Sequence, residues 1–186
     1  MLEIIVHGID IWQDSSTSEL TVYRRVAALL DHLFMGTAIE LVDGECTSES
    51  TKAAMALYNS CTGRFGLVYG RKIDWMTIVG HNNERIELSA NEWKRANVSD
   101  TIALTQQAKN LRSNATILSK LIKMGCTPAI LAMDWIGMCG YLYYLTFVEQ
   151  HGIFVANTFA KLVIPTSLDD IESAVTTINA LFKWRV

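Results

Sequence analysis

The stretch that decides the fold is Leu104–Val148, LTQQAKNLRSNATILSKLIKMGCTPAILAMDWIGMCGYLYYLTFV. In its first part, apolar residues recur at alternating intervals of four and three, at Leu104, Ala108, Leu111, Ala115, Leu118 and Ile122. This spacing is that of the a and d positions of a helical seam, and it predicts one long helix from Ser99 to Gly125. The repeat is too short for a free coiled coil, so the seam needs a partner within the same chain.

The second part of the stretch supplies that partner. Thr127 and Pro128 suit the N-cap and first position of a helix, which can continue to His151 before Gly152 ends it. Because this segment is apolar all round, it is typical of a helix at the centre of a bundle. We therefore expect residues 99–151 to form a long helical hairpin, with Leu111 and Leu118 buried against the second helix.

The same apolar segment raises the question of a membrane. Ala129–Val148 contains 20 residues with one charge, Asp134, and its length meets the criterion for a membrane span. An aspartate at the centre of a span costs about 2.5–3.5 kcal/mol on insertion. We expect a buried core helix, with a membrane span or an interfacial helix (129–148) as the alternatives, and Asp134 as a hydrogen-bonded buried carboxylate or at the wet end of the helix.

Outside this stretch, strand and helix signals alternate. The strands that we expect are Leu2–Trp12, Ala38–Val42, and a meander of Phe65–Tyr69, Ile73–Gly80 and Arg85–Leu88. The first helix that we expect begins at a capping box, Ser16–Glu19, and ends at Gly36. Further helices are expected at Thr51–Cys61, at Asn91–Ala96 and after Ser167. Residues 153–164 are apolar and fit either a strand or a helix.

The expected fold class is α+β. Residues 1–88 form a strand–helix–strand–helix and β-meander half, and residues 89–186 form an all-helical half built on the long helical hairpin, together one compact domain. The 186 residues are 50% hydrophobic with a net charge of −3, which excludes a disordered chain. The first residues contain no basic segment followed by a cleavage site, so we expect a cytoplasmic protein.

Enzyme motifs are absent from the sequence. It contains no Walker A motif, no G-x-G-x-x-G after a strand, no G-x-S-x-G and no H-E-x-x-H. The four histidines and four cysteines have no metal-ligand spacing. We therefore predict no catalytic residue, no cofactor and no metal site.

Charge is distributed unevenly along the chain. Residues 1–50 hold nine acidic and two basic residues, a net of −7, whereas residues 51–133 hold eleven basic and five acidic residues, a net of +6. The basic side chains that we expect to form a partner-binding face are Arg64, Arg71, Lys72, Lys94, Arg95, Lys109, Arg112, Lys120 and Lys123. An ordinary solvated helix surface is the alternative explanation.

These observations favour a non-enzymatic interaction or assembly protein: a structural or matrix-like subunit, a scaffold, or an inhibitor or immunity-type protein. It would associate with itself or with another protein, or dock on an anionic surface through the basic face. The first alternative is a nucleic-acid-binding protein, because the basic face lies within residues 64–123 and Arg64–Trp75 mixes basic and aromatic residues, which can stack RNA bases. The second is a small-molecule enzyme without a recognisable motif.

Overall fold

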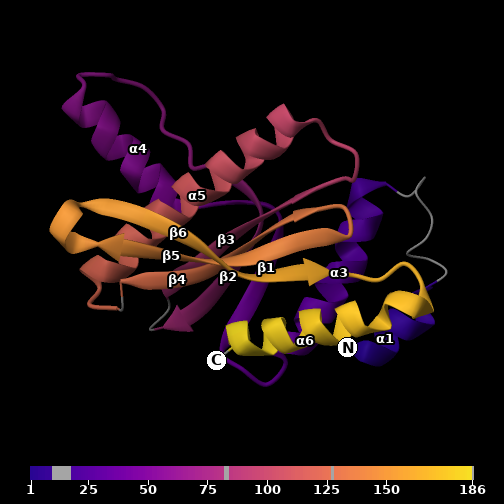
Figure 1. The fold of residues 1–186 in the computed structure, drawn as a ribbon. Coiled ribbons are helices and arrows are strands. Elements are labelled where there is room, and N and C mark those ends of the chain that lie inside the picture. The colour runs from indigo at the N-terminus through magenta and orange to yellow at the C-terminus, as the bar shows by residue number, and fades with distance from the viewer. Residues whose placement is uncertain (10–17, 82–83, 127, 186) are drawn as a thin grey trace.

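A computed structural model describes residues 1–9, 18–81, 84–126 and 128–185, which form a mixed sheet with helices on both faces (Figure 1). In the described residues the sheet has six strands that lie side by side in chain order. They are β1 (Ile39–Thr47), β2 (Lys72–His81), β3 (Glu84–Lys94), β4 (Ala129–Ile136), β5 (Cys139–Val148) and β6 (Ile153–Val163). Neighbouring strands are antiparallel except β3 and β4, which pair in parallel over three residues, Glu92–Lys94 against Asp134–Ile136.

The helices are distributed over the two faces of this sheet. They are α1 (Leu2–His7), α3 (Glu19–Phe34), α4 (Glu49–Cys61), α5 (Asp100–Lys123) and α6 (Ile171–Arg185), with short 3-10 helices η1 (Glu149–His151) and η2 (Leu168–Asp170). In Figure 1, α4 and α5 lie above the sheet and α1 and α6 below it. Helix α5 is the crossover that a parallel pair requires, because it connects the end of β3 to the start of β4.

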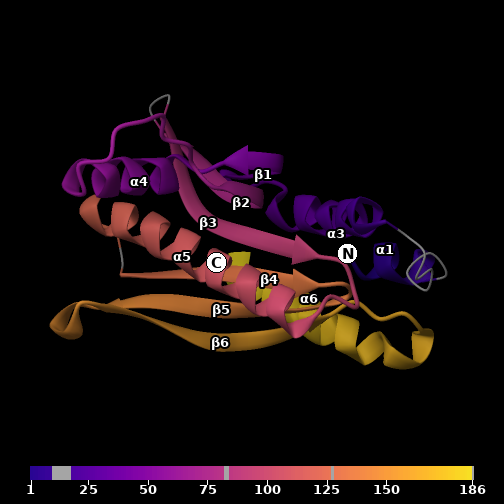
Figure 2. The ribbon, with the colours of Figure 1, turned by 90° about the horizontal axis from the view of Figure 1, so that it is seen from above.

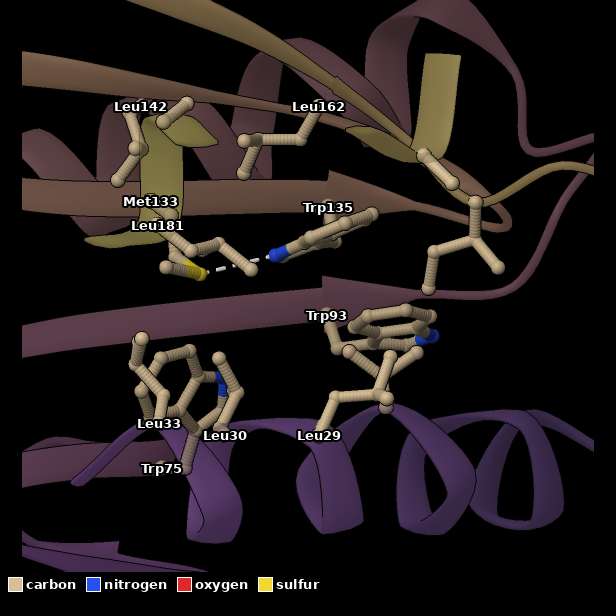
Figure 3. Close-up of a cluster of buried hydrophobic side chains, with 14 of the residues drawn as sticks. Leu29, Leu30, Leu33, Trp75, Trp93, Met133, Trp135, Leu142, Leu162 and Leu181 are labelled. Carbon is tan, nitrogen blue, oxygen red and sulfur yellow. Dashed lines mark hydrogen bonds between the residues drawn. The ribbon is translucent and has the colours of Figure 1, made fainter. Parts of the chain in front are cut away.

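Each face of the sheet has its own hydrophobic core. On the side of α1, α3 and α6, Trp93 stacks on Trp135 with ring centroids 5.1 Å apart, and leucines from α3, β5, β6 and α6 surround them (Figure 3). On the other side, Ile117, Leu118 and Leu121 of α5 pack on β2, β4 and β5. β1 to β5 contribute side chains to both cores, whereas β6 contributes Phe159, Ala160 and Leu162 to the first core only.

Several sequence predictions of helices are confirmed. Helices α3, α4 and α5 begin after Ser18, Ser48 and Ser99, and each of these serine side chains accepts a hydrogen bond from a backbone N–H three residues later. Residue Ser16 of the expected capping box lies outside the described residues, as does Thr127. The last helix, after Ser167, is also present as α6.

The predicted helical hairpin is wrong. Residues 129–148 form two antiparallel strands, β4 and β5, and β6 follows them, so the expected all-helical half contains half of the sheet. A strand that is buried on both faces also has a continuous apolar sequence, which periodicity alone does not distinguish from a buried helix. Gly137, at a φ of +59°, permits the tight turn that interrupts the apolar run.

Three shorter predictions are also wrong. The expected strand Leu2–Trp12 is helix α1 over Leu2–His7, and residues 10–12 lie outside the described residues. Phe65–Tyr69 forms no strand, and the expected helix at Asn91–Ala96 is the end of β3, as far as Lys94. In the first and last cases a short segment takes the structure that its tertiary neighbours impose.

The seam predicted along α5 is rotated from the buried face. Leu118 is fully buried, but Leu111 is half-buried and Leu104 is 64% exposed. No helix in the described part of the chain is long and apolar enough to cross a membrane.

Candidate functional site

The predicted basic residues are spread over α5, the neighbouring strand ends and the loops. Helix α5 carries Lys109, Arg112, Lys120 and Lys123, β2 and β3 carry Lys72 and Lys94, and Arg64, Arg71 and Arg95 lie in loops. The fold brings three of them together, because the Arg71 guanidinium donates to the Lys109 carbonyl (3.4 Å) and Arg112 lies near it. Burial and the charge of Arg112 lower the pKa of Arg71.

Part of this basic set is used inside the molecule. The Lys109 ammonium lies 2.8 Å from the buried Glu92 carboxylate. The Lys94 ammonium lies 3.9 Å from Asp74 and donates to the Trp93 carbonyl. The Arg64 guanidinium lies over the ring of Tyr58, 5.6 Å from its centre. These contacts place several of the predicted cations in intramolecular roles.

The basic and aromatic stretch after α4 forms an irregular, exposed segment. Phe65 is fully exposed, and Leu67 and Tyr69 are exposed as well. Because Phe65–Tyr69 does not join the sheet, the sheet-borne stacking surface expected for RNA is not formed by these residues.

A buried cluster of polar side chains lies where β3 and β4 diverge beneath α5. The amide of Asn114 on α5 pairs with the backbone of Ala90 on β3, since its Oδ1 accepts from the Ala90 N–H (2.8 Å) and its Nδ2 donates to the Ala90 carbonyl (2.7 Å). This is the pair of hydrogen bonds that a neighbouring strand would make. Asn114 thus replaces a missing strand contact.

On the β4 side of the gap between β3 and β4, asparagine side chains likewise form hydrogen bonds with backbone groups. The Met133 N–H of β4 donates to Asn91 Oδ1, and the Met133 carbonyl accepts from Asn110 Nδ2, both at 2.8 Å. The Tyr143 hydroxyl accepts from Asn114 Nδ2 and donates to Asn110 Oδ1, each at 2.9 Å. The burial of these asparagines is therefore explained by the hydrogen bonds that they form with backbone groups.

Two carboxylates lie at the closed end of this gap. Glu92 and Asp134 are partners in the parallel register, and both are at least 96% buried. Burial raises the pKa of Glu92 to about 7, although the hydrogen bond and charge of Lys109 oppose the rise. Burial raises the pKa of Asp134 to about 6, opposed by hydrogen bonds from Gln106 and Tyr141. Such groups exchange protons near neutral pH.

One long edge of the sheet carries few charges. β6 is the last strand of the order, and in Figure 2 it forms the outermost strand on its side. Lys161 is the only charged residue among the eleven of this strand. Ile153 is 50% exposed and Phe154 38% exposed, the latter with its ring 5.1 Å from that of Phe147. An exposed edge strand with few charges is a template for pairing with another strand.

The two edge strands of the sheet, β1 and β6, differ in their charge. The β1 edge carries two described acidic side chains, Glu40 and Asp43, and its register is broken by an irregularity between Asp43 and Cys46. Charges and irregularities of this kind deter strand pairing. The C-terminal end of β6 is closed, since the Thr177 hydroxyl of α6 accepts from the Val163 N–H and donates to its carbonyl.

Glu92, Gln106, Asn110 and Asn114 were not predicted from the sequence to form a cluster. A signal was present in α5, where Gln106, Asn110 and Asn114 recur every four residues and Leu118 continues the same row. The buried face of α5 therefore follows this row, which is polar up to Asn114 and apolar from Leu118. The predicted heptad seam followed a neighbouring row of the helix.

Among the described residues, no group of three or more histidine, cysteine or acidic side chains lies close enough to hold a metal ion. No protein-family model, curated protein sequence or solved structure matches this chain, so the geometry of its own residues carries the functional inference.

Proposed function

We propose that the protein is a non-enzymatic assembly subunit that self-associates by pairing the free edge of β6 with β6 of a second copy. The two strands run antiparallel about a two-fold axis, so the sheets of both copies become one continuous sheet. Such a contact is isologous and closes as a dimer.

The observation that carries this proposal is the contrast between the two sheet edges. β6 presents eleven residues with a single charge, whereas the shorter β1 carries the acidic side chains of Glu40 and Asp43. Ile153 and Phe154 are exposed, and pairing would bury part of their apolar surface. Backbone hydrogen bonds supply affinity, and the apolar side chains supply register.

Size-exclusion chromatography with light scattering tests the proposal. At micromolar concentrations we expect twice the 20.8 kDa mass of one chain. The double variant Ala156→Lys with Thr158→Lys places two charges on exposed positions of β6, where they oppose the same charges of the partner. This variant should elute as a monomer with an unchanged circular dichroism spectrum.

A matched control places the same two charges elsewhere. Ala53 and Ala56 are exposed on α4, and their replacement by lysine should leave the dimer intact. A wild-type chain that stays monomeric at every concentration would contradict the proposal, and so would dissociation of both variants alike.

A nucleic-acid-binding function is the second candidate, supported by the proximity of Arg71, Lys109 and Arg112. Phosphate contacts weaken as salt rises, with a log–log slope of about −0.9 per phosphate neutralised on duplex DNA. Strand pairing depends little on salt, so added RNA and a salt series separate the two functions. We further propose a cytoplasmic location, where the four free cysteines stay reduced.

A further inference from the structure

Helix α4 and the residues after it leave the body of the protein and return to it at one place. The Ser48 N–H donates to the Arg71 carbonyl (3.1 Å), and the Arg71 N–H donates to the Thr51 hydroxyl (2.7 Å). The buried Glu87 carboxylate accepts from the first two backbone N–H groups of α4, at 2.7 and 3.1 Å. Residues 48–71, here called the α4 arm, are therefore fixed at their base, and in Figure 1 they project at the upper left of the molecule.

The α4 arm is rich in exposed hydrophobic side chains. It holds six of the nineteen large ones that the described residues expose: Met55, Leu57, Tyr58, Phe65, Leu67 and Tyr69. Phe65 is 100% exposed and Leu67 84% exposed. Helix α4 buries only Ser50 and Thr51, and none of its residues belongs to either hydrophobic core. Because a surface helix of a globular protein typically packs an apolar stripe on the core, the apolar side chains of α4 are available to an external surface.

The α4 arm also carries net positive charge. Residues 48–71 contain three basic residues, Lys52, Arg64 and Arg71, and one acidic residue, Glu49, which gives a net charge of +2. The charged residues next to its base are balanced, two carboxylates against two cations: Glu87 and Glu92 against Lys109 and Arg112. At the far end, the Arg64 guanidinium lies 5.6 Å from the centre of the Tyr58 ring, so a positive charge lies among the exposed hydrophobic side chains.

We propose that the α4 arm inserts into the surface of an anionic lipid bilayer, with Phe65, Leu67 and Tyr69 at the depth of the lipid headgroups and Arg64 beside the phosphates. Peripheral segments bind bilayers through the apolar area that they bury and through the attraction of basic residues to anionic lipids. Aromatic side chains favour the interface between membrane and water. The anionic cytoplasmic leaflet offers such a surface.

The exposed side chains favour a bilayer over other occupants. Met55, Leu57 and Leu67 are not aromatic, so they cannot stack on nucleic-acid bases as aromatic rings do, whereas a bilayer surface accommodates both kinds of side chain. A second copy docked arm to arm about a two-fold axis would bring two arms of the same net charge together.

Co-sedimentation of the full-length protein with lipid vesicles tests this surface. Vesicles of phosphatidylcholine with about 30% phosphatidylserine should bind at least tenfold more strongly than vesicles of phosphatidylcholine alone, because they attract the basic residues of the arm. The difference should shrink as salt screens the charges. Phe65→Trp reports insertion, since lipids brominated in their acyl chains should quench the fluorescence that this variant adds to the wild-type emission.

Variants separate the apolar contribution from the charge. Phe65→Ser with Leu67→Ser should weaken binding to the anionic vesicles at least tenfold, because two exposed apolar side chains are lost. Leu168→Ser with Phe182→Ser is the matched control, an exposed pair outside the arm that should leave binding unchanged.

Arg64→Gln should weaken binding to the anionic vesicles about fivefold, the contribution of one basic residue near such a surface. Lys183→Gln, an exposed change on α6, should bind as the wild type does. All the replaced side chains are exposed, and circular dichroism shows whether each variant is folded.

Three results of the vesicle experiments would overturn the proposal: no binding to the anionic vesicles, equal binding to both kinds of vesicle, or unaltered binding by Phe65→Ser with Leu67→Ser. Binding of single-stranded RNA that this double variant loses, without vesicle binding, would make a nucleic acid the occupant. Loss of self-association in the same variant would make a second copy the occupant. The arm lies outside β6, so vesicle binding and β6 pairing are tested separately.

Discussion

Asn114 bridges strand and helix with a single side chain. Its amide satisfies both the N–H and the carbonyl of Ala90, and it also donates to the Tyr143 hydroxyl. A truncated side chain would leave these buried groups without partners. Each unsatisfied buried polar group costs about 1–3 kcal/mol.

We therefore expect Asn114→Ala to lower the free energy of unfolding by about 3 kcal/mol or more. Urea denaturation monitored by tryptophan fluorescence measures the loss. Asn179→Ala, an exposed change on α6, should remain within about 0.5 kcal/mol of the wild type. Equal stability of the two variants would show that the Asn114 contacts are not needed to close the gap.

Glu92 makes stability depend on pH in a predictable direction. Its pKa rises from 4.5 to about 7 on folding, so the folded state binds the proton more tightly than the unfolded state does. The stabilisation from the protonated form is fully present below about pH 4.5 and is lost as the pH rises through 7.

We expect the free energy of unfolding to fall between pH 6 and pH 8 in the wild type by more than it falls in Glu92→Gln. Asp134, with a pKa of about 6, contributes mostly at lower pH, which separates the two groups. Urea melts at pH 6, 7 and 8 provide the comparison. Parallel pH profiles for both proteins would refute the assignment.

Among the elements, α5 shows best how packing differs from the sequence pattern. Leu104 and Leu118 occupy equivalent heptad positions, but Leu118 is fully buried and Leu104 is 64% exposed. Leu118→Ala should cost about 2–5 kcal/mol, as expected for a buried leucine. Leu104→Ala should cost about 0.5 kcal/mol or less. The difference between the urea midpoints of the two variants tests whether the buried face of α5 is rotated from the predicted seam. Similar losses of unfolding free energy would instead support the predicted seam.

The sequence was sufficient for elements with local end signals. The capping box and Gly36 predicted α3, and Ser99 and Gly125 predicted α5, because capping depends on neighbours in the chain. It was not sufficient for residues 129–148, since burial on both faces removes the alternation that identifies a strand. The polar cluster depends on Asn114 meeting Ala90 across 24 residues, which no local pattern encodes.

At the scale of the whole molecule, the basic surface and the β6 edge make opposite predictions. The uneven charge along the chain predicts head-to-tail association that weakens with salt, whereas β6 pairing predicts a salt-tolerant dimer. Lys109 is a poor position for a charge-reversal test, because a glutamate there would face the buried carboxylate of Glu92 with a second negative charge.

The triple variant Arg112→Glu, Lys120→Glu and Lys123→Glu is the cleaner test. We expect it to dimerise as the wild type does at both low and high salt, because these residues lie on α5 and the proposed contact lies on β6. Light scattering over a salt series measures this. Loss of association at low salt would instead favour the charge-driven assembly.

The three-residue parallel contact between β3 and β4 divides the sheet into two antiparallel units, β1–β3 and β4–β6. Neighbouring strands within each unit pair over seven or more residues, so opening between the units breaks the fewest backbone bonds. The two units should then behave as separate cooperative blocks in native-state hydrogen exchange, with amides of β2 and of β5 grouped at different opening free energies. A protein whose sheet opens in this way would begin to unfold along its own midline while both of its halves remained intact.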